Sequence, residues 1–222
     1  MALAVSRRDP NRAYHDRVAG VYDGIYEDDP YWRLWRDLVW RRLRRALPPP
    51  PARVLEAGAG TGHFGFRCAR EGYCVTLSDL SPKMCDAARA KAAALPSGRR
   101  PDVVAADLAD LAPFGDAAFE AVVAIGDVLS FVPDAGAALR AVRRVLVPGG
   151  ILVATVDGAY GGAAHFLAAG DIPGLERFLR DGRTEFLTHR PEERFPARAF
   201  RSSQLKSAVP RSSACFTNAL VT

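Results

Sequence analysis

The 222-residue sequence predicts an α/β fold built on a doubly wound, mostly parallel sheet. Three observations lead to this prediction. Short apolar runs alternate with runs of helical periodicity between residues 53 and 156. A glycine-rich turn follows the first apolar run, and prolines and helix-capping residues separate the later ones. Finally, 49% of the residues are apolar, which suffices for the core of one domain.

The first fifty residues predict a helical lead to this core. Apolar side chains recur at steps of three and four residues, which predicts a helix over 30–47; they are Trp35, Leu38, Val39, Leu43 and Leu47. We expect this helix to pack on the core with its arginines in water, although a basic helix containing tryptophan can also lie on a membrane surface. The prolines at 48–51 end it.

Five strands are predicted after the prolines, over 53–58, 74–79, 102–107, 119–125 and 150–156. Ser81 and Pro82 provide an N-cap and a first-turn proline for a helix over 81–95. Asp134 can cap a helix over 135–146, which the Pro-Gly-Gly at 148–150 then ends. Continuous apolar strands between helices indicate a sheet covered on both faces.

Such sheets bind ligands beyond the carboxyl ends of their strands. This rule brings five strand-end residues to one rim, namely Glu56, Gly58, Asp79, Asp107 and Gly126. The rim is therefore the predicted binding site.

The glycine loop leaves two ligand classes open, besides a tight turn with no ligand. Gly60, Gly62 and Gly65 fit the spacing of a dinucleotide-binding loop, whereas Gly58, Gly60 and Gly62 fit S-adenosylmethionine equally well. Glu56 changes the balance, because a carboxylate there would repel a pyrophosphate and attract an ammonium and a sulfonium. Charge therefore favours S-adenosylmethionine.

The following strand ends suggest how an adenosine would be held. Asp79 is placed to accept both ribose hydroxyls, a role shared by dehydrogenases and methyltransferases. Asp107 can accept from the adenine amino group while the Leu108 N–H donates to a ring nitrogen, and Ile125 and Gly126 can meet the methionine end. Asp127, next in the chain, is expected to face the substrate or to be a plain loop aspartate.

Taken together in their order along the chain, the motifs resemble those of the class I S-adenosylmethionine-dependent methyltransferases, especially the broad small-domain type. The matching segments are "VLEAGAGTG", "SDLSPKMCDAARAK", "AADLADLAPFGDAAFEAVVAIGDVLSFVPD" and "ALRAVRRVLVPGGILVATV". The resemblance covers about residues 12–157. It implies a Rossmann-like methyltransferase sheet of seven strands with a final antiparallel strand, and it implies Tyr22, in "AGVYDGIY", near the cofactor mouth.

The predicted cofactor site therefore comprises Tyr22, Glu56, Gly58, Ala59, Gly60, Gly62, Asp79, Leu80, Met84, Asp107, Leu108, Ile125 and Gly126. The chain is interpreted as one domain in four segments: a helical lead over 1–50, a cofactor-binding core over 51–157, a substrate-cap insertion over 158–200 and an atypical tail over 201–222. After a helix-like stretch at 201–209, the tail does not read as two strands. We expect the sheet to lack at least one strand and to leave the edge of the fifth uncovered.

If the resemblance holds, the reaction is SN2 transfer of a methyl group to N, O, C or S of an acceptor, and alignment contributes more than any catalytic group. No catalytic residue is identified. His165, His189 and Tyr160 in the insertion are candidate bases, and His63 is expected to shape the loop. Two rival functions stay open: a non-catalytic methyltransferase-like binding domain, and an NAD(P)-linked oxidoreductase.

Composition narrows the partners. The net charge of +5 fits surface solvation better than a nucleic-acid partner, so a small-molecule acceptor is expected. The four cysteines show no metal-binding spacing, and we expect reduced thiols and no metal site. The sequence contains no signal-peptide pattern and no apolar run long enough to span a membrane, which predicts a cytoplasmic protein.

Overall fold

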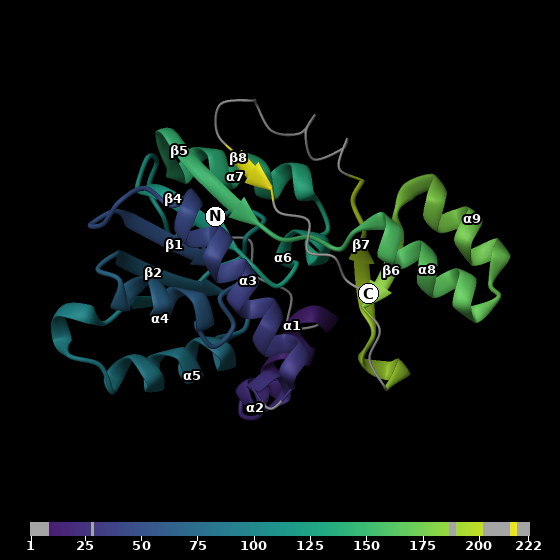
Figure 1. Cartoon of the computed structure of the whole chain (residues 1–222), viewed down its shortest axis with the longest axis horizontal. Coiled ribbons are helices and arrows are strands. Elements are labelled where there is room, and N and C mark those ends of the chain that lie inside the picture. The colour runs from purple at the N-terminus through teal and green to yellow at the C-terminus, as the bar shows by residue number, and fades with distance from the viewer. Residues whose placement is uncertain (1–8, 28, 187–189, 202–213, 217–222) are drawn as a thin grey trace.

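The computed structural model describes residues 9–27, 29–186, 190–201 and 214–216. Its centre is a sheet of strand order β3-β2-β1-β4-β5-β8, in which all neighbouring strands run parallel. The strands are β1 (Arg53–Ala57), β2 (Cys74–Asp79), β3 (Asp102–Ala105), β4 (Phe119–Ala124), β5 (Leu146–Ala154) and β8 (Ala214–Phe216). The predicted α/β fold is confirmed (Figure 1).

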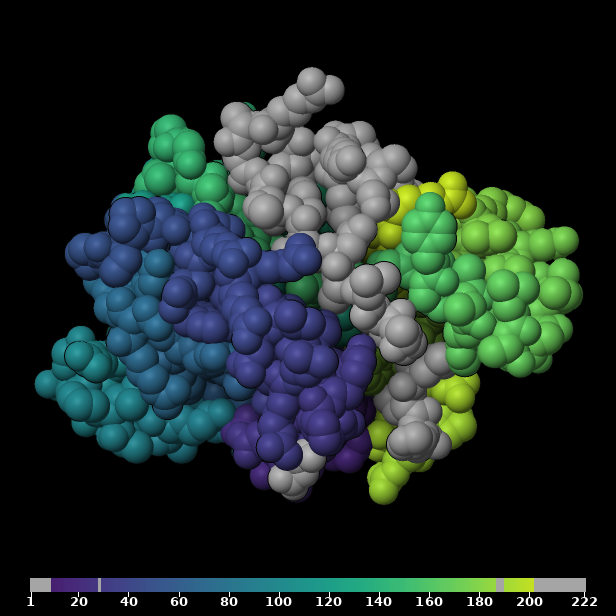
Figure 2. Space-filling model, in the orientation of Figure 1, coloured from purple at the N-terminus to yellow at the C-terminus, as the bar shows by residue number. Residues whose placement is uncertain are grey.

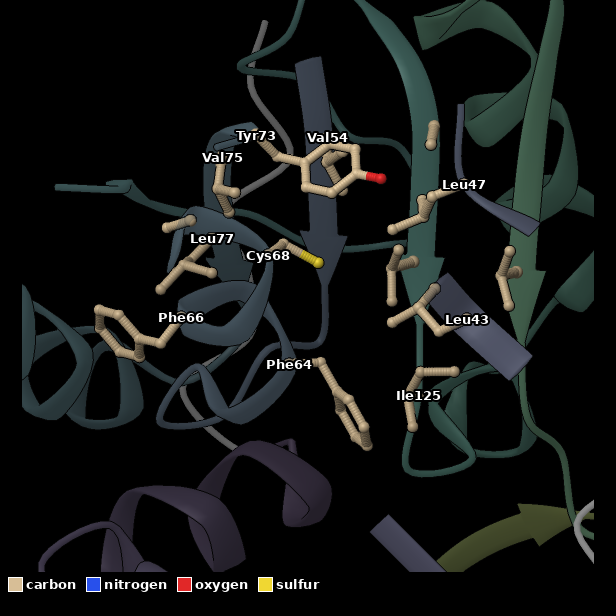
Figure 3. Packing of buried hydrophobic residues seen from close by; sticks show 14 of the residues in the cluster. Leu43, Leu47, Val54, Phe64, Phe66, Cys68, Tyr73, Val75, Leu77 and Ile125 are labelled. Atoms are coloured by element: carbon tan, nitrogen blue, oxygen red, sulfur yellow. The ribbon is translucent and has the colours of Figure 1, made fainter. Parts of the chain in front are cut away.

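Helices cover both faces of this sheet. One face packs against α3 (Pro30–Ala46), α4 (His63–Arg70) and α5 (Pro82–Ala93), and the other against α6 (Val128–Phe131) and α7 (Ala135–Val145). Neighbouring residues of a strand enter opposite clusters, so Val54 packs towards α3 and α4 while Leu55 packs towards α7. Figure 3 shows the first cluster, where Leu43, Phe64 and Cys68 gather beside Val54.

The helix predicted over 30–47 is present as α3. Asp29 caps it by accepting from the Tyr31 N–H at 2.8 Å, and Trp40 and Leu43 are buried. Leu38 departs from the expected core face, because its side chain is 49% exposed. At about 100° per residue, a contact face through Trp40 and Leu43 turns Leu38 towards solvent.

The Pro-Gly-Gly segment acts differently from the prediction. The helix before it ends at Val145, and residues 148–150 lie inside β5. The β4–β5 register shifts there, from Phe119 opposite Leu146 to Ala121 opposite Ile151. The segment is therefore a strand irregularity, since proline and glycine are tolerated where pairing is interrupted.

The tail departs from the resemblance. Among the described residues the main sheet has six strands, and β8 runs parallel to β5 instead of antiparallel. The expectation of an uncovered β5 edge is wrong for residues 152–154, because they pair with residues 214–216 of β8. The last helix predicted over 201–209 lies outside the described residues, apart from Arg201.

Two helices and a hairpin separate β5 from β8. Helices α8 (Ala159–Ala169) and α9 (Ile172–Asp181) project away from the sheet, whereas the antiparallel hairpin β6 (Arg183–Phe186) and β7 (Phe195–Arg198) lies towards α1 (Pro10–Val18) (Figure 1). In Figure 2 the N-terminal helices, with α2 (Tyr22–Glu27), form the surface between the α5 side of the core and this hairpin. None of the helices in the described segments is both long and apolar enough to cross a membrane.

Candidate active site

The glycine loop between β1 and α4 folds as the spacing of its glycines requires. Gly58, Gly60 and Gly62 have φ of +68°, +54° and +89°, values that side chains other than glycine rarely adopt. Gly65 serves another purpose, because an added Cβ would lie 2.2 Å from Leu77 Cδ2 and 2.6 Å from Glu56 Oε2. Its missing side chain lets α4 lie directly on the sheet.

Asp79 holds the loop from the end of the neighbouring strand. Its Oδ2 accepts from the Gly60 N–H at 2.7 Å and its Oδ1 from the Ser81 N–H at 2.8 Å. The side chain is buried, and this desolvation raises its pKa, while the nearby His15 acts in the opposite direction. Because a carboxylate offers about four lone-pair sites, Asp79 keeps capacity for further donors.

A solvent-open cleft of about 650 Å³ lies at the carboxyl ends of β1, β2, β3 and β4. Nine of the predicted site residues line it, namely Tyr22, Gly58, Gly60, Asp79, Leu80, Asp107, Leu108, Ile125 and Gly126. The structure thus brings together residues from four strand ends and from the N-terminal lead. We refer to this space as the cofactor cleft.

The other four predicted residues lie outside this cleft. Glu56 and Ala59 line the adjoining space described below. Gly62 is the N-cap residue of α4, and an added Cβ there would meet Leu77 at 2.7 Å. Met84 is fully buried beside Val18 and lines neither space, so the structure gives it a packing position.

Glu56 is buried beneath the glycine loop. Its Oε2 accepts from the Gly65 N–H at 2.7 Å. Burial raises the pKa of Glu56 to about 8, which outweighs the hydrogen bonds from Gly65 and Phe64. The side chain is therefore mostly protonated at neutral pH. It would attract a cation strongly only if binding of that cation displaced the proton.

Asp107 lies two residues beyond β3 and accepts from the Ala109 N–H at 2.8 Å. Burial raises its pKa. Leu108, the next residue, lines the same cleft.

The N-terminal lead closes the loop side of the cleft. The Tyr22 ring lies over Gly60, where an added Cβ would be 3.4 Å from its Cε1. Asp23 fastens α2 in place, because it accepts from the Thr61 hydroxyl at 2.5 Å and from Lys91 Nζ at 2.7 Å. Burial raises the pKa of Tyr22 well above its ordinary value, so the phenol stays protonated.

A second space, of about 1200 Å³, adjoins the cofactor cleft, and we call it the aromatic chamber. Its aromatic walls come from the lead, α4, α6 and the β6–β7 hairpin, and consist of Tyr14, Tyr22, Tyr26, Tyr31, Trp32, Trp35, Phe64, Phe131 and Phe186. Phe186 stacks on Phe195 at 4.8 Å and packs against Phe131 at 5.4 Å, ring centroid to centroid. These contacts place the hairpin next to α6 at the wall of the chamber.

Two acids from adjacent strand ends also line the chamber. Asp127 follows β4 and Asp157 follows β5. Burial and the charge of Asp127 raise the pKa of Asp157 to about 7. Sequence reasoning noticed Asp127 but missed Asp157; the available signal was that each lies three residues beyond its strand's last residue, Ala124 and Ala154.

The candidate bases of the insertion lie elsewhere. Tyr160 and His165 belong to α8 and line neither space, and the Tyr160 side chain is 89% exposed. His189 is outside the described residues. His63 lines the chamber, and burial lowers its pKa to about 4, so it is neutral at pH 7.

Known proteins are similar to this chain in sequence. Residues 54–150 match the family described as methyltransferase domain. The chain is 31% identical over 138 residues to the tRNA 5-carboxymethoxyuridine methyltransferase of Escherichia coli K12, covering 62% of this chain and 52% of that protein. It is 39% identical over 106 residues to the ubiquinone biosynthesis O-methyltransferase of Xanthomonas axonopodis pv. citri, covering 48% and 43%. The chain thus spans about half the length of the curated relatives it matches.

A solved structure gives the same fold over nearly the whole chain. The DhpI–SAM–HEP complex superposes with a TM-score of 0.64 at 20% identity, covering 93% of this chain and 88% of that one. Sheet order and cleft together define an α/β protein with a cleft at its strand ends. The sequence matches show that residues 54–150 form a methyltransferase domain, and the similarity to S-adenosylmethionine-dependent methyltransferases supports S-adenosylmethionine as the cofactor. These matches favour a methyltransferase over the NAD(P)-linked interpretation.

Proposed function

We propose that this chain transfers a methyl group from S-adenosylmethionine to a small-molecule acceptor held in the aromatic chamber. One observation carries the proposal: the cofactor cleft and the chamber share lining residues, which are His15, Tyr22, Gly58, Ile125, Gly126 and Phe131. An SN2 transfer needs donor and acceptor to meet in line, and two spaces that adjoin at these residues would bring them together.

The residues of the cleft fit the cofactor. Asp79 is a buried carboxylate with unused acceptor capacity, which suits a ribose diol. Gly58 and Gly60 line the cleft with backbone alone, where an added Cβ would meet Val128 at 2.5 Å and Tyr22 at 3.4 Å, and Glu56 offers a carboxyl group near the loop. When bound, S-adenosylmethionine supplies a methyl group already activated on a sulfonium.

The chain's own task is then to align the reactants and to exclude water. Well-oriented reactants can gain on the order of 7–11 kcal/mol over the same reaction between free partners. Tyr22 lines both spaces and Phe186 of the β6–β7 hairpin lines the chamber, which supports this role. An enclosed aromatic wall favours a small, flat acceptor over a large polymer.

An RNA base is the second candidate acceptor. The similarity to a tRNA methyltransferase and the net charge of +5 support it. It is tested with bulk tRNA as acceptor at 50 and 200 mM salt. RNA recognition through phosphates predicts that the affinity falls by roughly 10³-fold over that range, whereas a small neutral acceptor predicts little change.

The first experiment is thermal unfolding with S-adenosylmethionine, S-adenosylhomocysteine, NAD and NADP in parallel, followed by an acceptor screen that detects S-adenosylhomocysteine release. Ligand at 100 times its Kd is expected to add about 2.7 kcal/mol of stability. We expect a rise with the adenosylmethionine pair alone. A protein that binds S-adenosylmethionine yet methylates nothing would support the non-catalytic alternative, and a rise with NAD or NADP alone would contradict the proposal.

Asp79→Asn is the matched binding variant. It removes the negative charge that the ribose hydroxyls would use, and each charge-assisted bond contributes about 1.5–3 kcal/mol. The Kd for S-adenosylhomocysteine, measured by calorimetry, is expected to rise by about 10- to 100-fold. Asp134→Asn, the same change at the exposed cap of α7, serves as control. An unchanged Kd in Asp79→Asn would mean that the ribose is bound elsewhere.

A further inference from the structure

Asp127 and Asp157 occupy equivalent places on neighbouring strands. In the β4–β5 register Ala124 lies opposite Ala154, and each acid follows three residues later. Parallel strands in register bring such positions side by side beyond the edge of the sheet. The two carboxyl groups thus enter the aromatic chamber together.

Reciprocal hydrogen bonds fix the two strand ends. The Thr155 hydroxyl accepts from the N–H groups of Gly126 and Asp127, at 3.0 and 3.1 Å. In return, the Ser130 hydroxyl accepts from the Asp157 N–H at 2.9 Å. Asp127 has a φ of +60°, which an aspartate adopts only at a cost in backbone energy. The surrounding contacts therefore hold Asp127 in one orientation.

These backbone contacts leave one oxygen of the Asp127 side chain without a hydrogen-bond donor from the described part of the chain. Its Oδ1 is buried and has no hydrogen-bond partner among the described residues. A buried acceptor without a donor is uncommon in folded proteins and points to a missing partner. Burial raises the pKa of Asp127, although the nearby Thr155 hydroxyl acts against this rise.

Besides the tyrosines of the aromatic wall, the charged and titratable groups around the pair come from four other elements. His15, Arg36, Glu56 and His63 line the chamber from α1, α3, β1 and α4. His63 is neutral at pH 7 because of burial, and Arg36 lies over the Tyr26 ring at 5.4 Å. The remaining wall is aromatic, and aromatic faces attract cations.

Building on the proposed function, we propose that Asp127 and Asp157 form the site that binds the head group of the acceptor. This head group is an amine attached to a flat aromatic group, and the pair of acids accepts a proton from it. An ammonium brings three donors and a positive charge to two carboxyl groups and an aromatic wall. A hydroxyl brings one donor, and a carboxylate brings none. The site therefore selects an amine over both.

The proton balance is simple. The bound ammonium gives one proton to a carboxylate of the pair, which frees the nitrogen lone pair. That lone pair forms the N–C bond to the methyl group as the S–C bond breaks and its electrons stay on sulfur. The products are a methylated ammonium and S-adenosylhomocysteine, and the pair returns its proton to water. Two coupled acids suit this step, because the pair releases its protons over a wide pH range.

The test compares three probes that share one ring and differ in the head group: phenethylamine, 2-phenylethanol and phenylacetate. Binding to the full chain saturated with S-adenosylhomocysteine is measured by calorimetry at pH 8. We expect phenethylamine to bind at least about tenfold more tightly than 2-phenylethanol, and phenylacetate most weakly. In Asp127→Asn and Asp157→Asn the preference for the amine is expected to fall to within about twofold. Asp134→Asn is expected to keep it.

Several outcomes would overturn the assignment: equal affinities, no binding of the amine, tighter binding of phenylacetate, or an amine preference that survives in both variants. Thermal unfolding shows whether either variant fails to fold. In that case the other variant provides the test of the amine preference. If both folded variants lost affinity for S-adenosylhomocysteine itself, the acids would belong to the cofactor site and the inference would fail. A wild-type chain that does not bind S-adenosylhomocysteine would instead contradict the proposed function.

Discussion

At the scale of single residues, Glu56 and Asp79 show how burial changes what a strand-end acid can do. Both are buried and both accept from the backbone of the glycine loop. Asp79 receives two backbone donors, and burial raises its pKa against the opposing effect of His15. For Glu56 desolvation is also the largest effect, and this side chain carries a proton at neutral pH. Burial thus favours the protonated form of both acids on this rim.

The raised pKa of Glu56 predicts a contribution of this residue to the pH dependence of stability. Its pKa rises from 4.5 to about 8 on folding, so the folded chain holds a proton that the unfolded chain has lost. The contribution is full below about pH 4.5 and is lost as the pH rises through 8. The unfolding free energy of the wild type falls as the pH rises through this window. Glu56→Gln should reduce that fall by on the order of 4–5 kcal/mol.

Urea unfolding at a series of pH values measures this effect. Asp157, whose pKa is also raised, contributes equally to the pH dependence of both proteins. The unfolding free energy of the wild type minus that of the variant therefore reports the contribution of Glu56. Glu176→Gln, the same change on the exposed face of α9, is the control. Identical pH profiles for wild type and Glu56→Gln would contradict the prediction.

At the scale of the element, α4 illustrates how one missing side chain sets a helix on a sheet. Gly65→Ala would place a Cβ against Leu77 and Glu56, at distances shorter than real Cβ contacts. We expect this overpacking to lower the unfolding free energy by about 1–3 kcal/mol. The midpoint of thermal unfolding is the measurement.

The control is the same substitution in another helix. Gly24 lies in α2, and an added Cβ there meets nothing within 4 Å. Because alanine is the better helix former, Gly24→Ala should be neutral or stabilise by up to about 1 kcal/mol. Equal effects of the two substitutions would show that helix propensity, and not packing, determines the result.

At the scale of the whole molecule, the N-terminal lead is part of the site although it precedes the sheet by many residues. Asp23 joins it to the loop through Thr61 and to α5 through Lys91. The aromatic contacts of Tyr14 with Phe186 and Phe195 join the lead to the hairpin. Segments from both ends of the described chain thus enclose one space.

Asp23→Ala is expected to loosen this closure. Removing both contacts should weaken S-adenosylhomocysteine binding by about 5- to 10-fold, as for the loss of one or two partly exposed hydrogen bonds. Trypsin should cut the lead at Arg12 or Arg17 faster than in the wild type. Asp37→Ala, which breaks an ion pair with Arg67 outside both spaces, should change neither quantity. Full protection and full affinity in Asp23→Ala would mean that the other contacts of the lead hold it, such as the aromatic contacts of Tyr14 and the hydrogen bond from the Ser81 hydroxyl to Asp16 at 2.6 Å.

The sequence by itself determined the features that depend on local pattern. Strand and helix positions, the left-handed glycines and the place of Asp79 at the rim follow from periodicity, capping and backbone sterics, which act over a few residues. Tertiary structure alone decided the pairing of Asp127 with Asp157, the protonation of Glu56, the exposure of Leu38 and the covering of β5 by β8. These features depend on which distant segments pack together and how fully they exclude water, and such contacts leave no local pattern in the chain.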